Sequence, residues 1–239
     1  GCSQMETKAP LIPMEDFMRN PEKSSFQISP NGNYVAFMKP WNTRMNVFVM
    51  DMNTNKEERL TSSEARGIYG FTWLTDNRIG YVKDDGGDEN IHLYAVNIDG
   101  TNEIDLTPFE NIQARIIDNL ENDKEHLIIG LNKRNPEIHD PYRVNINDGT
   151  MEMIAENPGN ISGWGTDHNG KLRIATTSDG VNTSLLYRDK ESEDFKPILT
   201  TDFKVSVVPL FFTFDNKSLY VASNRGRDKT AIFEFDLKK

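Results

Sequence analysis

The sequence lacks the features that mark several large classes of protein. It has one cysteine in 239 residues, which excludes an internal disulfide framework. No apolar run approaches the roughly 20 residues that a membrane-spanning helix needs. Lysine and arginine number 27 against 37 aspartates and glutamates. The resulting net charge of -10 argues against electrostatic binding of nucleic acid or of an anionic membrane surface.

Motifs for catalysis are also missing. None of the 16 glycines opens a Gly-x-Ser-x-Gly turn, which presents the nucleophile of many serine hydrolases. The four histidines have no aligned partner, and we expect them to be surface or hydrogen-bonded residues: His92, His126, His139 and His168. The acidic segment 84–90 lacks the spacing of an EF-hand loop, and we interpret it as a solvated connection between two strands. The sequence therefore predicts no catalytic residue, no metal site and no cofactor.

Helix is scarce as well. Residues 14–18 form the one segment with helical character, and Pro13 and Pro21 bound it. Elsewhere short β-prone runs alternate with polar turns. This pattern predicts an all-β protein with a short helical segment near the N-terminus.

The β-prone runs are organised as a repeat. An aromatic residue followed within two or three positions by Asp or Asn recurs about every 45 to 48 residues, at Phe48, Tyr94, Tyr142, Tyr187 and Phe233. Polar turns keep the same period, at residues 30–32, 76–77, 122–124, 169–170 and 215–217. An aliphatic residue closes the repeat at Leu60, Leu106, Ile154 and Leu199, and the fifth would fall beyond Lys239.

A period in the forties with four short strands per unit indicates a β-propeller. We expect about five four-stranded blades, the last of them incomplete, at approximately 24–63, 64–108, 109–157, 158–203 and 204–239. Residues 1–23 would form a tether and the short helix. The sequence leaves open whether the blades close into a ring or form an open arc, because Pro10 and Pro13 make the N-terminal stretch a poor closing strand.

Four aromatic residues lie in or near the predicted first strands, and we expect them to pack between neighbouring blades: Trp73, Trp164, Phe212 and Phe214. A charged loop at residues 133–140 is longer than a hairpin requires. Within it, Arg134 and Asp140 can form a local ion pair, and Arg134, Glu137 and Asp140 are candidates for contact with another domain.

The single cysteine, Cys2, follows a glycine and precedes a polar stretch. A cysteine in this position is typical of a bacterial lipoprotein after signal-peptide cleavage. The hypothesis places the chain at the bacterial cell envelope, facing the periplasm, with a lipid on Cys2 as its link to the membrane. The alternative is an incidental free thiol.

Several segments resemble bacterial prolyl oligopeptidase-family serine peptidases, of the acylaminoacyl- or dipeptidyl-peptidase type, over residues 12 to about 237. The similar segments are Ile12-Pro13-Met14-Glu15-Asp16-Phe17, Gly86-Gly87-Asp88-Glu89-Asn90 with His92-Leu93-Tyr94, Asp105-Leu106-Thr107-Pro108-Phe109, Asn135-Pro136-Glu137, and Ala155-Glu156-Asn157-Pro158-Gly159-Asn160 followed by Trp164. The resemblance implies an N-terminal propeller that covers a C-terminal α/β-hydrolase domain, which carries the catalytic residues and is absent from these 239 residues. No catalytic residue can be transferred to this chain.

The resemblance implies that the chain admits short peptides to the hydrolase domain and excludes folded proteins. Its expected partners are that domain and peptide substrates. One alternative is a free-standing TolB-like lipoprotein propeller that acts as a protein-binding scaffold. A glycan-binding or glycosidase propeller is a third reading, and it would need carboxylates that converge on the channel.

Overall fold

The computed structural model describes residues 11–18, 22–84 and 90–238. It contains one short helix, α1, and 19 strands arranged in five antiparallel sheets. The first four sheets have four strands and the fifth has three, as the repeat predicts. No helix in this described part of the chain has the length and apolar character to cross a membrane.

Each sheet is a meander of strands that are consecutive in the sequence. The helix is α1 (Met14–Met18). The first sheet contains β1 (Ser24–Ile28), β2 (Tyr34–Trp41), β3 (Arg44–Asp51) and β4 (Glu57–Arg59). The second contains β5 (Ile68–Thr75), β6 (Arg78–Asp84), β7 (Ile91–Asn97) and β8 (Ile104–Asp105). The third contains β9 (Ala114–Asp118), β10 (His126–Asn135), β11 (Ile138–Asn145) and β12 (Met151–Met153). The fourth contains β13 (Ile161–Thr166), β14 (Leu172–Ser178), β15 (Asn182–Tyr187) and β16 (Lys196–Asp202), and the fifth β17 (Val207–Phe212), β18 (Ser218–Ser223) and β19 (Ala231–Asp236).

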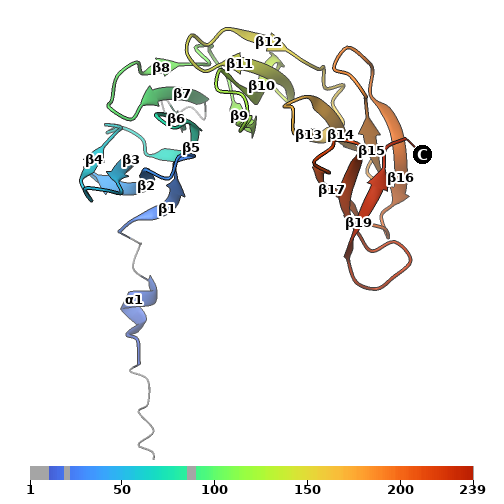
Figure 1. The fold of residues 1–239 in the computed structure, drawn as a ribbon, viewed down its shortest axis with the longest axis horizontal. Helices are drawn as coiled ribbons and strands as arrows, with labels where there is room; N and C mark the ends of the chain where they lie inside the picture. The colour runs from blue at the N-terminus through green and yellow to red at the C-terminus, as the bar shows by residue number, and fades with distance from the viewer. Residues whose placement is uncertain (1–10, 19–21, 85–89, 239) are drawn as a thin grey trace, which may run out of the picture.

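The sheets follow one another around an open arc, with the first and fifth sheets at its two ends (Figure 1). The first strands of the sheets, β1, β5, β9, β13 and β17, lie on the concave side of the arc, and the fourth strands, β4, β8, β12 and β16, lie on the outside. Every polar turn of the repeat connects a first strand to a second strand, and every aromatic marker lies on a third strand. The predicted propeller architecture is confirmed.

Apolar clusters join three pairs of neighbouring sheets. Ala36 and Val47 of the first sheet pack with Phe71 and Ile79 of the second. A larger cluster joins the second sheet to the third, and a smaller one, including Phe212, joins the fourth to the fifth. A blade cannot bury both of its faces alone, so these contacts are what make the sheets one structure.

Polar contacts hold the third sheet to the fourth. The Arg143 guanidinium forms an ion pair with Glu191, with Nη2 to Oε1 at 3.0 Å, and donates to the Gly170 carbonyl at 2.8 Å. Arg188 donates in the opposite direction, from the fourth sheet to the Ile154 carbonyl at 3.1 Å. This junction therefore differs in chemistry from the three apolar ones.

The aromatic residues of the first strands follow the prediction in part. Trp73 and Phe212 are buried in inter-sheet clusters, as expected. Trp164 is half-buried and packs against Phe195, in the β15–β16 connection of the same sheet, with ring centroids 5.7 Å apart. The prediction for Phe214 is wrong: it lies in the turn after β17, is 95% exposed and stacks on His168. It falls outside the strand, so no neighbouring sheet covers it.

Candidate functional site

A cleft of about 980 Å³ lies where the first strands of the third, fourth and fifth sheets approach one another. Its walls come from β9, β13 and β17 and from two turns, at residues 119–125 and 167–170. Trp164 and Phe211 contribute aromatic surface, and the turns contribute carboxylates and main-chain groups. The size lies at the upper end of the roughly 300–1,000 Å³ typical of ligand pockets.

One lining residue of the cleft, Leu120, has unusual backbone geometry. Leu120 has a φ of 52°, which is uncommon for a bulky side chain, and it is buried. The Asp118 carboxylate supports this conformation by accepting the Leu120 N–H at 2.8 Å, and its other oxygen accepts the Thr166 hydroxyl. The Leu120 side chain packs on Gly170, where an added Cβ would lie 3.0 Å from Leu120 Cδ2. Leucine and glycine thus fit together across the junction of the third and fourth sheets.

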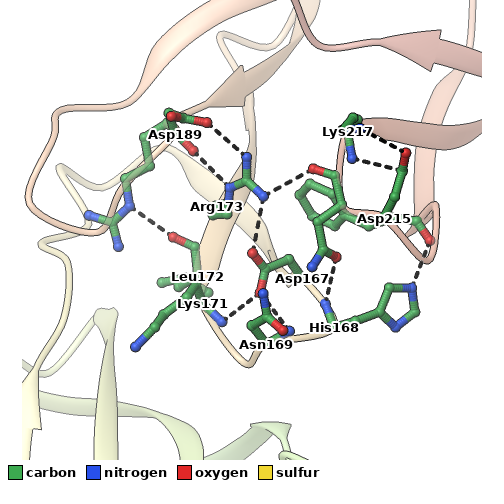
Figure 2. Close-up of polar contacts among 12 residues, drawn as sticks. Asp167, His168, Asn169, Lys171, Leu172, Arg173, Asp189, Asp215 and Lys217 are labelled. Atoms are coloured by element: carbon green, nitrogen blue, oxygen red, sulfur yellow. Dashed lines mark hydrogen bonds and ion pairs between the residues drawn. The ribbon is translucent and has the colours of Figure 1, made fainter.

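Arg173, on β14, organises the side of the cleft that faces the fifth sheet (Figure 2). Its guanidinium is buried and forms ion pairs with Asp167 at 3.0 Å and Asp189 at 3.1 Å. It also donates to the Asn216 carbonyl at 3.2 Å and lies 5.1 Å from the centre of the Phe212 ring. Burial alone would lower the pKa of Arg173, but Asp167 and the Tyr187 phenol outweigh it and raise the pKa. The arginine stays charged and ties the fourth sheet to the fifth.

His168 is fully engaged in the same region. Its main-chain N–H donates to the Asn216 side chain at 3.0 Å, and its Nε2 lies 2.9 Å from the Phe212 carbonyl. A carbonyl only accepts, so Nε2 carries the proton in this contact. His168 therefore acts as a structural bridge between the fourth and fifth sheets, in agreement with its predicted role as a hydrogen-bonded residue.

The other histidines divide into two kinds. His92 contacts Asp105 at 2.8 Å, and His126 contacts Asp123 at 3.1 Å. His139 contradicts the expectation of a surface or hydrogen-bonded side chain, because its Nε2 is buried and no described group bonds it. Burial, reinforced by the Arg115 charge and opposed by Asp140, lowers the pKa of His139.

The loop predicted to carry an ion pair is braced as expected. Arg134 binds Asp140 through two bonds, Nε to Oδ2 at 2.9 Å and Nη2 to Oδ1 at 3.0 Å. Asn157 closes the arrangement, since its N–H donates to Asp140 at 2.7 Å and its carbonyl accepts from Arg134 at 2.8 Å. Glu137 is exposed at the tip of this β10–β11 hairpin. None of Arg134, Glu137 and Asp140 is among the residues lining the cleft, and contact of this loop with another domain stays a prediction.

Two sequence-based hypotheses fall on residues outside the described parts of the chain. Cys2 and residues 85–89 of the acidic segment both lie outside the described residues. Lipidation of Cys2 and the interpretation of the acidic segment as a solvated connection therefore stay predictions. Across residues 11–18, 22–84 and 90–238 there is no group of three or more His, Cys, Asp or Glu side chains suited to holding a metal ion.

Comparisons with known proteins relate the chain to peptidases. It is 31% identical over 237 residues to dipeptidyl aminopeptidase BIII of Pseudoxanthomonas mexicana, covering 95% of this chain and 34% of that protein. It is 24% identical over 247 residues to dipeptidyl peptidase family member 6 of Caenorhabditis elegans, covering 95% of this chain and 33% of that protein. This chain matches the N-terminal propeller portion of prolyl oligopeptidase-family peptidases.

The chain spans about one third of the length of the family members it matches. No protein-family model matches the sequence. Solved structures share the fold at low identity. An oligogalacturonate lyase has a TM-score of 0.66 at 12% identity, covering 91% of this chain and 67% of the other. The acylaminoacyl peptidase of Pyrococcus horikoshii has a TM-score of 0.55 at 15% identity, covering 89% of this chain and 37% of the other. TolB of Acinetobacter baumannii has a TM-score of 0.52 at 13% identity, covering 90% of this chain and 54% of the other.

The Arg173 network can be tested by removing its charge. Arg173→Met would leave the Asp167 carboxylate buried without its partner, so we expect a loss of about 3–5 kcal/mol in the free energy of unfolding. The matched control is Lys217→Met, which removes an exposed lysine paired with Asp215 and should cost less than about 1 kcal/mol. Urea unfolding of both variants measures the difference. Equal losses would contradict a structural role for the Arg173 network.

The half-buried His139, whose Nε2 atom is buried, predicts a specific pH dependence of stability. Its pKa in the folded protein lies below the ordinary value of 6.5, so below about pH 6.5 the unfolded chain takes up a proton that the folded chain excludes. Stability should therefore fall as the pH decreases from 6.5 toward the pKa of the folded state. His139→Gln should remove this component. Melting temperatures measured between about pH 7.5 and 5.5 test it, and an unchanged slope in the variant would refute it.

Proposed function

We propose that this chain is the non-catalytic propeller of a serine peptidase and controls which peptides reach an α/β-hydrolase domain of the same protein. The observation that carries the proposal is the match to dipeptidyl aminopeptidase BIII along 95% of the chain. The chain accounts for 34% of that relative, so the relative has ample length for a further domain.

Access control follows from the geometry of stacked sheets. Their first strands line the concave side of the arc, so anything that moves along that side passes rigid β-structure. A narrow passage lined by such strands would exclude a folded protein, whereas an extended peptide is a single chain wide. A covered active site also excludes water and competing substrates from the reaction. The hydrolase domain would cleave the peptide through an acyl-enzyme intermediate formed on its own serine.

A free-standing scaffold of the TolB type is the second candidate. The TM-score of 0.52 to TolB over 90% of this chain favours it at the level of the fold. A scaffold would bind a protein partner and would carry no reactive serine.

Labelling of the intact gene product with a fluorophosphonate probe separates these two functions. We expect one serine to be labelled, together with hydrolysis of a short peptide that the probe abolishes. The same peptide sequence placed in a surface loop of a folded protein should remain uncut, because the propeller excludes the fold. Absence of labelling would reject the peptidase function and favour the scaffold. Equal cleavage of the free and the embedded peptide would reject access control.

A further inference from the structure

The first strands differ in how their free edges are used. Each first strand is the outermost member of its sheet, so one side of its main chain has no strand partner. Such an edge can pair with another extended chain through main-chain hydrogen bonds. In a propeller these edges face the concave side, where a passing peptide would meet them.

Side chains from neighbouring sheets occupy several of these edges. The Trp73 indole donates to the Gln27 carbonyl of β1 at 3.1 Å, and the Gln27 amide donates to the Phe71 carbonyl of β5 at 2.8 Å. Asn119 donates to the Trp73 carbonyl at 3.3 Å, and His168 to the Phe212 carbonyl of β17 at 2.9 Å. These contacts satisfy main-chain groups that a peptide would otherwise bind.

The edge of β13 is used differently. The hydrogen bonds that reach it from the third sheet and from the connection after that sheet lie at its two ends. Asn157 bonds the main-chain N–H and carbonyl of Ile161 at the start of β13, while Thr166 bonds Asp118 and the His168 carbonyl accepts from Asn122 at or beyond its end. The main chain between these contacts, at residues 162–165, reaches the cleft, where Trp164 and Gly165 form part of the wall.

The composition of β13 keeps this edge accessible. Gly163 and Gly165 flank Trp164, and a Cβ added at either would crowd side chains of β14, lying 2.7 Å from Thr176 Oγ1 at Gly163 and 3.2 Å from Ile174 Cβ at Gly165. One consequence is that Trp164 is the one large side chain along this part of the strand. Glycine also lets a second main chain approach closely. Opposite, Leu210 and Phe211 are 41% and 58% exposed.

The charge of the cleft selects among peptides. Its lining includes five carboxylates and one lysine: Asp118, Glu121, Asp123, Glu125, Asp167 and Lys124. Asp167 is buried and paired with Arg173, so the negative charge open to a ligand comes mainly from the turn at residues 119–125. Negative charge there attracts cationic side chains and repels anionic ones. Aromatic rings such as those of Trp164 and Phe211 also favour the aliphatic stem and the charge of a lysine or arginine.

We propose that the cleft binds an extended peptide with basic side chains, whose main chain pairs with the free edge of β13 and whose side chains contact Trp164 and Phe211. The choice of a peptide as ligand rests on the proposed function, whereas the place and the charge preference rest on the geometry. The site would hold a substrate on its path through the propeller and favour basic sequences.

Binding of three labelled peptides tests this site. The probes are acetyl-Ala-Lys-Ala-Lys-Ala-amide, the same peptide with glutamate in place of lysine, and the lysine peptide with alternate amides N-methylated. The intact protein is first treated with a fluorophosphonate, so that any reactive serine is blocked, and affinity is measured by fluorescence anisotropy. We expect the lysine peptide to bind at least about tenfold more tightly than either of the others, because each lacks one element of recognition.

Two variants and a control locate the binding. Trp164→Ala and Phe211→Ala should each weaken binding of the lysine peptide by about tenfold or more. Phe211 is 58% exposed and packs on Tyr220, with ring centroids 5.4 Å apart, so its replacement removes one ring contact and no buried side chain. The control is Phe233→Ala, which removes an aromatic residue that is 40% exposed on β19, outside the cleft, and should have no effect on affinity.

The outcomes separate this site from the proposed function. Equal affinity for the lysine and glutamate peptides, unchanged binding after N-methylation, or wild-type affinity in both cleft variants would overturn the proposal. A protein that resists the fluorophosphonate but shows the predicted preference and its loss in the variants would contradict the peptidase function and support the peptide site. A protein that the fluorophosphonate labels but that shows no preference for the lysine peptide would support the peptidase function and overturn the peptide site.

Discussion

The structure depends on contacts between each first strand and the one that follows it 44 to 48 residues later. A four-stranded sheet exposes two faces and an inner edge, and it is stable only when a neighbour covers them. In this chain the neighbour supplies both apolar surface and specific donors, such as the Trp73 indole to the Gln27 carbonyl at 3.1 Å. The sequence period is therefore also the spacing at which one blade bonds to the next.

The junction between the third and fourth sheets shows how the same architecture accommodates a different surface. Charged and polar groups replace an apolar cluster there, through Arg143 with Glu191 and Arg188 with the Ile154 carbonyl. Buried polar groups need hydrogen-bond partners, which these contacts supply. The cleft lies beside this junction, and Leu120 packed on Gly170 forms part of its lining. The polar junction between the third and fourth sheets and the cleft thus lie next to each other.

The architecture could be predicted because its signals are local and repeated. The aromatic markers and the polar turns occur in every unit, and the Arg134–Asp140 pair joins residues six positions apart in one hairpin. The cleft could not be predicted in this way. It arises where residues 48 positions apart, such as Asp118 and Thr166, meet across two sheets. It also depends on the positive φ of Leu120, which no sequence motif indicates. The expectation for Phe214 fails for a related reason, since two residues past the end of β17 a side chain is exposed, whereas Phe212 at the end of the strand is buried.

Hydrogen exchange measured by mass spectrometry tests the central claim most directly. Trp73→Phe keeps a ring at the centre of the cluster between the first two sheets and removes the indole N–H that bonds the Gln27 carbonyl. If donors from one blade hold the edge of the next, amide exchange should become faster in β1 of the first sheet as well as in β5, where the substitution lies. Faster exchange confined to β5, with β1 unchanged, would contradict the account.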